Sequence, residues 1–182
     1  MTIAFAIAMA GATHAGAVMW NALNIQASPA TTDKSAATYC GYLFTGSDYT
    51  AATQYLLEGT LDLDAFKSAA IGTKTTTYVA NNDMLNIVGG QSGSFVSESV
   101  TAYLVIVDAA TVDAASNYLV AKVNGTGSEY ITQAFGTSGN KTFSFGAQAA
   151  NTGWQAIAVP EPTSGLMLLL GVAGLALRRR RV

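Results

Sequence analysis

The sequence has little charge and almost none of the residues that most often perform catalysis or bind metals. Charged residues make up 11% of the 182 residues, against about 25% in an ordinary soluble domain. The chain contains one Cys and one His, so it cannot assemble the Cys and His ligand sets of structural zinc sites. A single Cys also excludes an internal disulfide bond. These absences exclude most metal-dependent and triad chemistry.

The few charges are distributed unevenly. Nine Lys and Arg residues and eleven Asp and Glu residues give a net charge of −2. Four of the nine cations form the run Arg178 to Arg181, which leaves five Lys to face eleven acids. A protein that binds nucleic acid through a basic face needs a concentration of Lys and Arg. The acidic remainder of the chain therefore excludes a nucleic-acid partner of that kind.

The C-terminus combines three features in a fixed order. The tetrapeptide at 159–162 is stiff, because each proline fixes φ and favours an extended conformation in the residue before it. Residues 165–177 have no polar side chain, and in lipid such a run satisfies its backbone hydrogen bonds only as a helix. Four arginines follow, and they favour the cytoplasmic side of a membrane. The pattern predicts a single hydrophobic C-terminal helix at a membrane.

The length of this apolar run suits a temporary membrane hold. A helix of thirteen residues is about 20 Å long, which is shorter than the ~30 Å hydrocarbon core. The alternative is a buried C-terminal core helix. A core helix at the surface of a domain needs one polar face, and this run has none.

The whole segment from Val159 to Val182 resembles a PEP-CTERM sorting signal. The resemblance implies recognition by exosortase, a membrane-embedded cysteine transpeptidase of Gram-negative bacteria. Bacteria that produce proteins with this signal often make exopolysaccharide. It also implies export, a transient stay in the inner membrane with the C-terminus in the cytoplasm, cleavage near the motif, and release to the cell surface or extracellular matrix. The residues that carry the resemblance are substrate residues, not catalytic ones: the sorting motif Pro160, Glu161 and Pro162, and the stop-transfer cluster Arg178, Arg179, Arg180 and Arg181.

The first 17 residues are expected to be a signal peptide that is truncated at its start. Residues 3–11 are apolar, and Ala15 and Ala17 fit the small-x-small rule for signal cleavage. No Lys or Arg precedes the apolar run, which we interpret as a start codon assigned too far downstream. The alternative is a buried first strand or helix. Removal of this peptide would also remove His14, and with it every imidazole-dependent triad, dyad or zinc site.

Residues 18–158 are expected to form one domain, an antiparallel β-sandwich of about nine strands. Their Thr, Ser, Gly, Asn, Val and Tyr content suits strands and turns, and turn residues separate short apolar runs throughout. The strand near residues 100–107 should be central and covered on both faces. The expected strands are 18–25, 39–44, 75–80, 84–88, 95–107, 118–123, 129–135, 141–147 and 154–159.

A short helical insertion is expected between the second and third of these strands. Residues 48–59 begin with a possible capping Asp, continue with apolar residues at helical spacing, and end with Gly. Residues 62–70 could form a second helical piece.

The acidic residues of the body offer limited chemistry. Glu58, Glu98, Glu129 and several Asp could in principle supply the paired carboxylates of a small hydrolase. Asp62 with Asp64, or Asp108 with Asp113, could bind Ca²⁺ through oxygen atoms, although neither pair has EF-hand spacing. Solvated loop acids are the alternative in each case, and no metal or cofactor is expected.

The aromatic residues suggest a binding function as an alternative. Trp20 and Trp154, with some of the eight Tyr, could stack on sugars if they lie together on an exposed face; packing in the core is the other interpretation. Cys40 lies in an expected strand and is either a small buried hydrophobe or the site of an intermolecular link. The leading hypothesis is thus a non-catalytic structural or surface protein, and the alternatives are an exopolysaccharide-associated carbohydrate-binding module and a carboxylate-dependent hydrolase.

Overall fold

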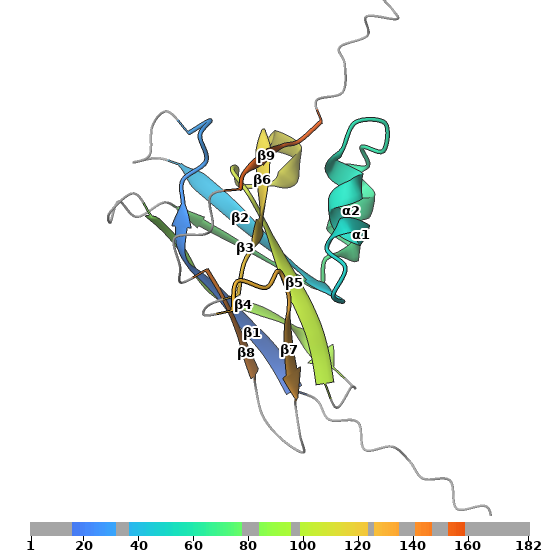
Figure 1. Ribbon diagram of the computed structural model, residues 1–182, viewed down its shortest axis with the longest axis vertical. Helices are drawn as coiled ribbons and strands as arrows, with labels where there is room; N and C mark the ends of the chain where they lie inside the picture. Colours follow the sequence, from blue (N-terminus) through green and yellow to red (C-terminus); the bar gives the residue numbers. More distant parts are fainter. Residues whose placement is uncertain are drawn as a thin grey trace, which may run out of the picture.

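The computed structural model describes residues 16–31, 37–77, 84–95, 99–123, 126–134, 141–146 and 153–158. These residues are mostly β, as predicted, with a few short helices between strands (Figure 1). The strands are β1 (Gly16–Gln26), β2 (Thr38–Thr45), β3 (Gly72–Thr77), β4 (Met84–Phe95), β5 (Ser99–Val107), β6 (Asn117–Ala121), β7 (Ile131–Ala134), β8 (Lys141–Phe145) and β9 (Gln155–Ala156). The helical elements are α1 (Thr50–Thr53), η1 (Gln54–Leu56), α2 (Leu63–Ala69) and η2 (Val112–Ala114).

The described strands form two sheets. One sheet has the order β4-β1-β8; the other has the order β3-β2-β5-β6-β9, and β7 pairs with β5 beside this path. The strand pairs are antiparallel, as predicted, except that β1 and β8 run parallel. The expectation of a wholly antiparallel body is wrong for that pair. Parallel neighbours need a long crossover connection, and here most of the body lies between the two strands.

Strand β5 is covered on both faces, as its continuous apolar sequence predicts. Alternate side chains point to opposite faces of a strand. Val100, Ala102, Leu104 and Ile106 belong to one core cluster, whereas Tyr103, Val105 and Val107 belong to a second. The first cluster also contains buried side chains of β1 and β8, so it joins the two sheets: Val18, Trp20, Ala22, Ile25, Phe143 and Phe145.

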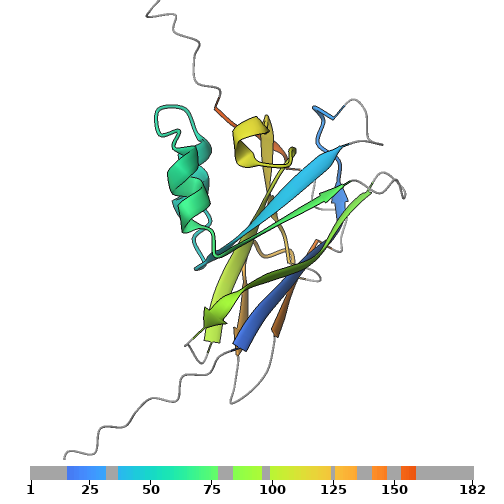
Figure 2. The ribbon, with the colours of Figure 1, turned by 180° about the vertical axis from the view of Figure 1, so that it is seen from behind.

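The helical insertion covers the opposite face of the larger sheet. It contributes Ala52, Leu56 and Phe66 to the second cluster, together with side chains of β2 and β5. Figure 2, the view from behind, shows the insertion beside this sheet. Its two pieces follow β2 and precede β3, where the sequence predicts them. Asp62 starts α2 by accepting a hydrogen bond from the Ala65 backbone N–H at 2.9 Å. The first piece is shorter than residues 48–59, because α1 passes into the 3₁₀ turn η1.

Strand β4 corrects one predicted boundary. The sequence predicts that it ends at Val88, before the turn residues Gly89 and Gly90, and that Phe95 begins the next strand, but β4 runs to Phe95 along β1. As β1 advances by one residue, its partner changes from Gly90 to Val88, and near the other end from Ser94 to Ser92. Gly89 and Gly93 are therefore the extra residues of bulges, which lets the strand continue through glycine.

Two predicted segments lie largely or wholly outside the described residues. These are the signal peptide, of which only residues 16 and 17 are described, and the C-terminal segment 159–182 with its hydrophobic helix. Within the described part of the chain, no helix has the length and apolar character needed to cross a bilayer.

Candidate functional site

Residues 153–158 connect the body to the C-terminal motif, and we call them the strap. Within the strap, β9 pairs antiparallel with β6, so that Ala156 lies opposite Asn117 and Gln155 opposite Tyr118. The Ile157 N–H donates to the Ser116 carbonyl at 2.9 Å, and the Ala158 N–H donates to the Leu56 carbonyl at 2.8 Å. The strap therefore ends against the helical insertion.

Side chains add a few further contacts to the strap. Trp154 is half-buried; its indole N–H donates to the Gln26 carbonyl at 3.0 Å, and its ring centroid lies 5.9 Å from that of Tyr39. The Tyr118 hydroxyl donates to Gln155 Oε1 at 2.6 Å. Burial raises the pKa of Tyr118. Ile157 is 6% exposed, whereas Gln155 and Ala156 are exposed.

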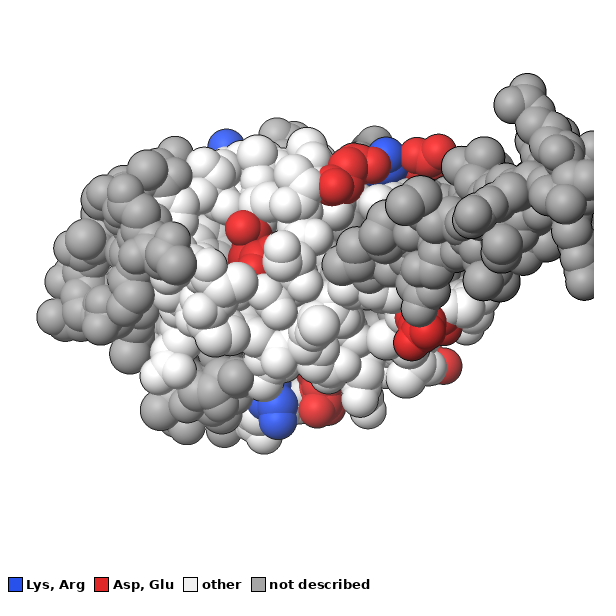
Figure 3. Space-filling view, turned by 90° about the horizontal axis from the view of Figure 1, so that it is seen from above, with Lys and Arg blue, Asp and Glu red and all other residues white. Residues whose placement is uncertain are grey.

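The strap places the C-terminal exit at one end of the molecule. Strand β1 begins near the opposite end of the long axis (Figures 1 and 2). Seen from above, the described surface is mostly white, that is, uncharged, with separate acidic groups and few basic ones (Figure 3). This view offers no basic patch on its described surface for an anionic ligand.

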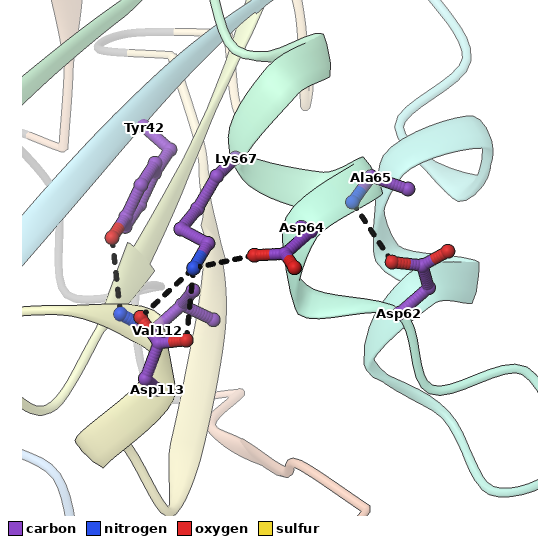
Figure 4. Close-up of polar contacts among 7 residues, drawn as sticks. All are labelled: Tyr42, Asp62, Asp64, Ala65, Lys67, Val112 and Asp113. Atoms are coloured by element: carbon purple, nitrogen blue, oxygen red, sulfur yellow. Dashed lines mark hydrogen bonds and ion pairs between the residues drawn. The ribbon is translucent and has the colours of Figure 1, made fainter.

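A lysine joins the helical insertion to η2 near this end. Lys67 Nζ lies 2.8 Å from Asp64 Oδ1 and 2.9 Å from Asp113 Oδ1 (Figure 4). Hydrogen bonds to Asp64 and Asp113 raise the pKa of Lys67, and the bond with Lys67 lowers the pKa of Asp64. The Val112 N–H donates to the Tyr42 hydroxyl at 3.0 Å in the same region. Burial is the main cause that raises the Tyr42 pKa from 10 to about 12.

Asp108 has a structural role that the sequence did not reveal. Its Oδ1 accepts hydrogen bonds from the N–H groups of Ser116 and Asn117, both at 2.8 Å. Its Oδ2 accepts from Ser28 Oγ and Asn117 Nδ2, both at 2.7 Å. Four donors therefore occupy this carboxylate and tie the turn after β1 to the β5–β6 connection. Ser28 and Asn117 carry no sequence motif that marks them as its partners.

The acids considered for calcium or catalysis are separated or already bonded. Asp113 pairs with Lys67 rather than with Asp108. Glu58 is exposed, Glu129 Oε1 lies 3.9 Å from Lys122 Nζ, and Glu98 is outside the described residues. In the part of the chain that the structure describes, no three His, Cys, Asp or Glu residues gather as a metal site would require.

The aromatic and cysteine candidates occupy different environments. Trp20 is 1% exposed and belongs to the core cluster between the sheets, so its ring has no face available for a sugar. Trp154 is half-buried against Tyr39 and the end of β1. The structure therefore does not bring the two tryptophans to one exposed face. Cys40 is a buried free thiol, as its position in an apolar strand predicts.

The remaining candidate residues lie at the chain ends. Ala17 belongs to β1 and pairs with Ser94, whereas Ala15 and His14 are outside the described residues. Cleavage after Ala17 would leave the β1 register intact from Val18 onward. The sorting motif and the stop-transfer cluster are also outside the described residues, namely Pro160, Glu161, Pro162, Arg178, Arg179, Arg180 and Arg181.

The comparisons with known proteins identify the C-terminal segment. The body defines a mostly β domain with a helical insertion, and no curated protein and no solved structure matches the chain. A family model described as the PEP-CTERM protein-sorting motif matches residues 158–181. The chain therefore carries a PEP-CTERM sorting motif, as its C-terminal sequence predicts. This motif indicates a protein that is exported and sorted by exosortase.

Proposed function

We propose that this chain is a non-catalytic structural protein of the cell envelope or extracellular matrix, delivered there by exosortase. The observation that carries the proposal is the sorting motif at residues 158–181. In this proposal the body, residues 18–158, folds outside the cytoplasm as a sandwich of two sheets. Proteins with this motif are typically surface proteins rather than enzymes.

The sorting step assigns a separate task to each part of the tail. Pro160, Glu161 and Pro162 form the stiff strip that exosortase recognises. The short apolar run holds the chain in the inner membrane, and the four arginines keep the C-terminus in the cytoplasm, because guanidinium groups resist transfer across lipid. Cleavage near Glu161 then releases the body.

The chemistry of the described body supports a non-catalytic role. Asp108 is occupied by four hydrogen-bond donors, and Asp113 is paired with Lys67. Loss of the signal peptide would remove the single His of the chain. Asp108 and Asp113 therefore stabilise the body through these contacts, and a structural surface role requires no catalytic group.

Cleavage of the tail in the native host tests the proposal. The body would carry an internal tag, and intact masses would be compared between strains with and without exosortase. We expect a shortened C-terminus only where exosortase is present. A Glu161→Ala variant should stay full length, whereas the matched control Glu58→Ala, an exposed acid of the body, should be shortened normally. A chain that ends at Val182 in both strains would disprove sorting.

The surface role has its own test. The processed protein should be recovered from the cell surface or matrix fraction and should show no hydrolysis of the host's exopolysaccharide. Hydrolysis of the exopolysaccharide by the purified body, if it is lost on substitution of a single carboxylate, would overturn the non-catalytic assignment.

A further inference from the structure

The strap brings the folded body very close to the sorting motif. Ala158 is the last residue of the strap and is hydrogen bonded to Leu56. Pro160 follows two residues later, which places it at most about 7 Å further along the chain. Gly165, where the apolar run begins, is at most about 25 Å from Ala158. No linker therefore separates the body from the segment that exosortase must reach.

A folded domain at this distance restricts access to the motif. A domain of this size has a radius of gyration of about 14 Å, which is large compared with the one residue that separates Ala158 from the Pro-Glu-Pro motif. An enzyme that binds an extended peptide needs room on both sides of it. Release of the strap would add six residues, or about 20 Å of reach. The length of chain free between body and membrane therefore depends on whether the strap is docked.

The strap is paired with its sheet over a shorter length than the other described strands of that sheet. Its pairing with β6 covers only Gln155 and Ala156, whose side chains are both exposed. Ile157 is its one buried side chain, at 6% exposure, and the half-buried Trp154 packs against the other core cluster. Segments with few buried apolar contacts open locally at much lower free energy than the whole domain unfolds. The strap can therefore leave while strands β1 to β8 remain paired.

We propose that the docked strap is an autoinhibitory contact, and that exosortase cleaves the chain in a state in which residues 153–158 have left the body. This inference rests on the proposed sorting function. The stability of strap docking then sets the rate of processing. Docking also gives the body a defined end after cleavage, since the residues that remain can return to β6 and Leu56.

Processing rates in the host test this proposal directly. A flexible Gly/Ser linker of eight residues between Ala158 and Val159 leaves the whole Pro-Glu-Pro motif intact and frees it from the strap. The same linker inserted after Gly59, in an exposed turn with no atom near the glycine, is the matched control. We expect the first insertion to speed cleavage several-fold and the control insertion to leave the rate unchanged. Equal rates in all three proteins would overturn the proposal.

A second variant separates strap release from general destabilisation. Ile157→Ala weakens docking and should also speed cleavage several-fold. On the background of the linker after Ala158 it should have no further effect, because the strap no longer limits access. The same acceleration on both backgrounds would show that unfolding of the body is responsible, and it would refute the autoinhibitory contact. If even the wild-type chain is never shortened, the sorting function itself fails and this inference fails with it.

Amide hydrogen exchange tests strap release without the enzyme. The full chain would be purified in detergent from a strain that lacks exosortase. We expect the N–H groups of Ile157 and Ala158 to exchange about 100-fold faster, or more, than those of Leu104 and Ile106 in β5. Equal protection at all four positions would show that the strap opens only with the whole domain, and it would overturn the proposal.

Discussion

Strand β5 and the strap belong to the same sheet, but the fold secures them very differently. Strand β5 has nine residues, pairs with β2, β6 and β7, and contributes to core clusters on both of its faces. The strap has a paired segment of two residues and one partner strand. The difference separates a strand secured on both faces from a short edge segment. In the proposal above, the first keeps the body folded and the second is released for processing.

The largest effect is expected in the scaffold. Leu104 is fully buried in β5 between the sheets, and Leu104→Ala removes methyl groups that neighbouring side chains cannot replace. We expect a loss of about 2–5 kcal/mol in the free energy of unfolding, measured by urea denaturation of the body. A loss below about 1 kcal/mol would break the comparison, because β5 would then be no better secured than the strap.

The next effect concerns the end of β5, where Asp108 binds four donors. Asp108→Ala leaves the Ser28 hydroxyl and the Asn117 side chain without their carboxylate partner. Because hydrogen bonds to charged groups are worth about 1.5–3 kcal/mol, we expect a loss of about 2–3 kcal/mol. The matched control is Asp113→Ala, whose partner Lys67 lies at the surface, and it should change the urea midpoint little. Equal losses would contradict the structural role of Asp108.

Close packing beside β5 predicts a third effect. A Cβ atom at Gly41 of β2 would lie 2.7 Å from Trp20 Cη2, and it would also approach Leu104. Gly41→Ala should therefore cost about 1–3 kcal/mol, as overpacking in cores does. The control is Gly153→Ala in the strap, where the added Cβ meets no atom within 4 Å. Thermal unfolding should separate the two variants clearly, and similar midpoints would disprove the close contact.

A smaller effect is expected in the strap itself. Ile157→Ala should cost about 1–2 kcal/mol, and the loss should appear as local opening rather than as a lower midpoint for the whole body. Exchange of the Ala158 N–H should accelerate, while exchange of the β5 amides stays the same. A global loss equal to that of Leu104→Ala would show that the strap is part of the scaffold.

The smallest effect is an alkaline loss of stability on the insertion side of β5. Burial raises the pKa of Tyr103 from 10 to about 12, with a further contribution from the charge of Asp48. Above pH 10 the unfolded chain releases this proton while the folded chain keeps it, so stability falls as the pH rises from about 10 to about 12. Thermal midpoints at pH 9 and pH 11 should differ by a few degrees.

Phenylalanine variants assign this alkaline loss. The difference between the two pH values should shrink in Tyr103→Phe. It should persist in the control Tyr130→Phe, because Tyr130 is 43% exposed. If both variants show the same pH difference as the wild-type body, Tyr103 is not the source of the alkaline loss of stability.

The strand pattern was predictable wherever the signal is local. The apolar run at 100–107 predicts a strand that is buried on both faces, and β5 has that environment. Gly89 and Gly90 carry an equally local turn signal, yet β4 continues through them along its long partner β1, with Gly89 as the extra residue of a bulge. Glycine allows either a turn or a bulge at such a position, and pairing with a neighbouring strand determines which of the two forms.

The candidate site was predictable only in part for the same reason. The sequence predicts a strand at 154–159, and the structure has a shorter one in that place. Nothing in the sequence connects Ala158 to Leu56, or Ser28 to Asp108, which are 80 residues apart. Trp20 and Trp154 look alike as candidates for sugar binding, but the fold buries the first and leaves the second partly accessible.

The sequence by itself determined the sorting motif and the mostly β character of the body. Both depend on residues that are neighbours along the chain, so their physical properties can be read directly from composition and order. Only the tertiary structure decided that β8 runs parallel to β1, that four donors surround Asp108, and that the strap ends on the helical insertion. These features require contacts between distant residues, and backbone groups that are chemically identical along the chain acquire particular partners only when the whole body packs.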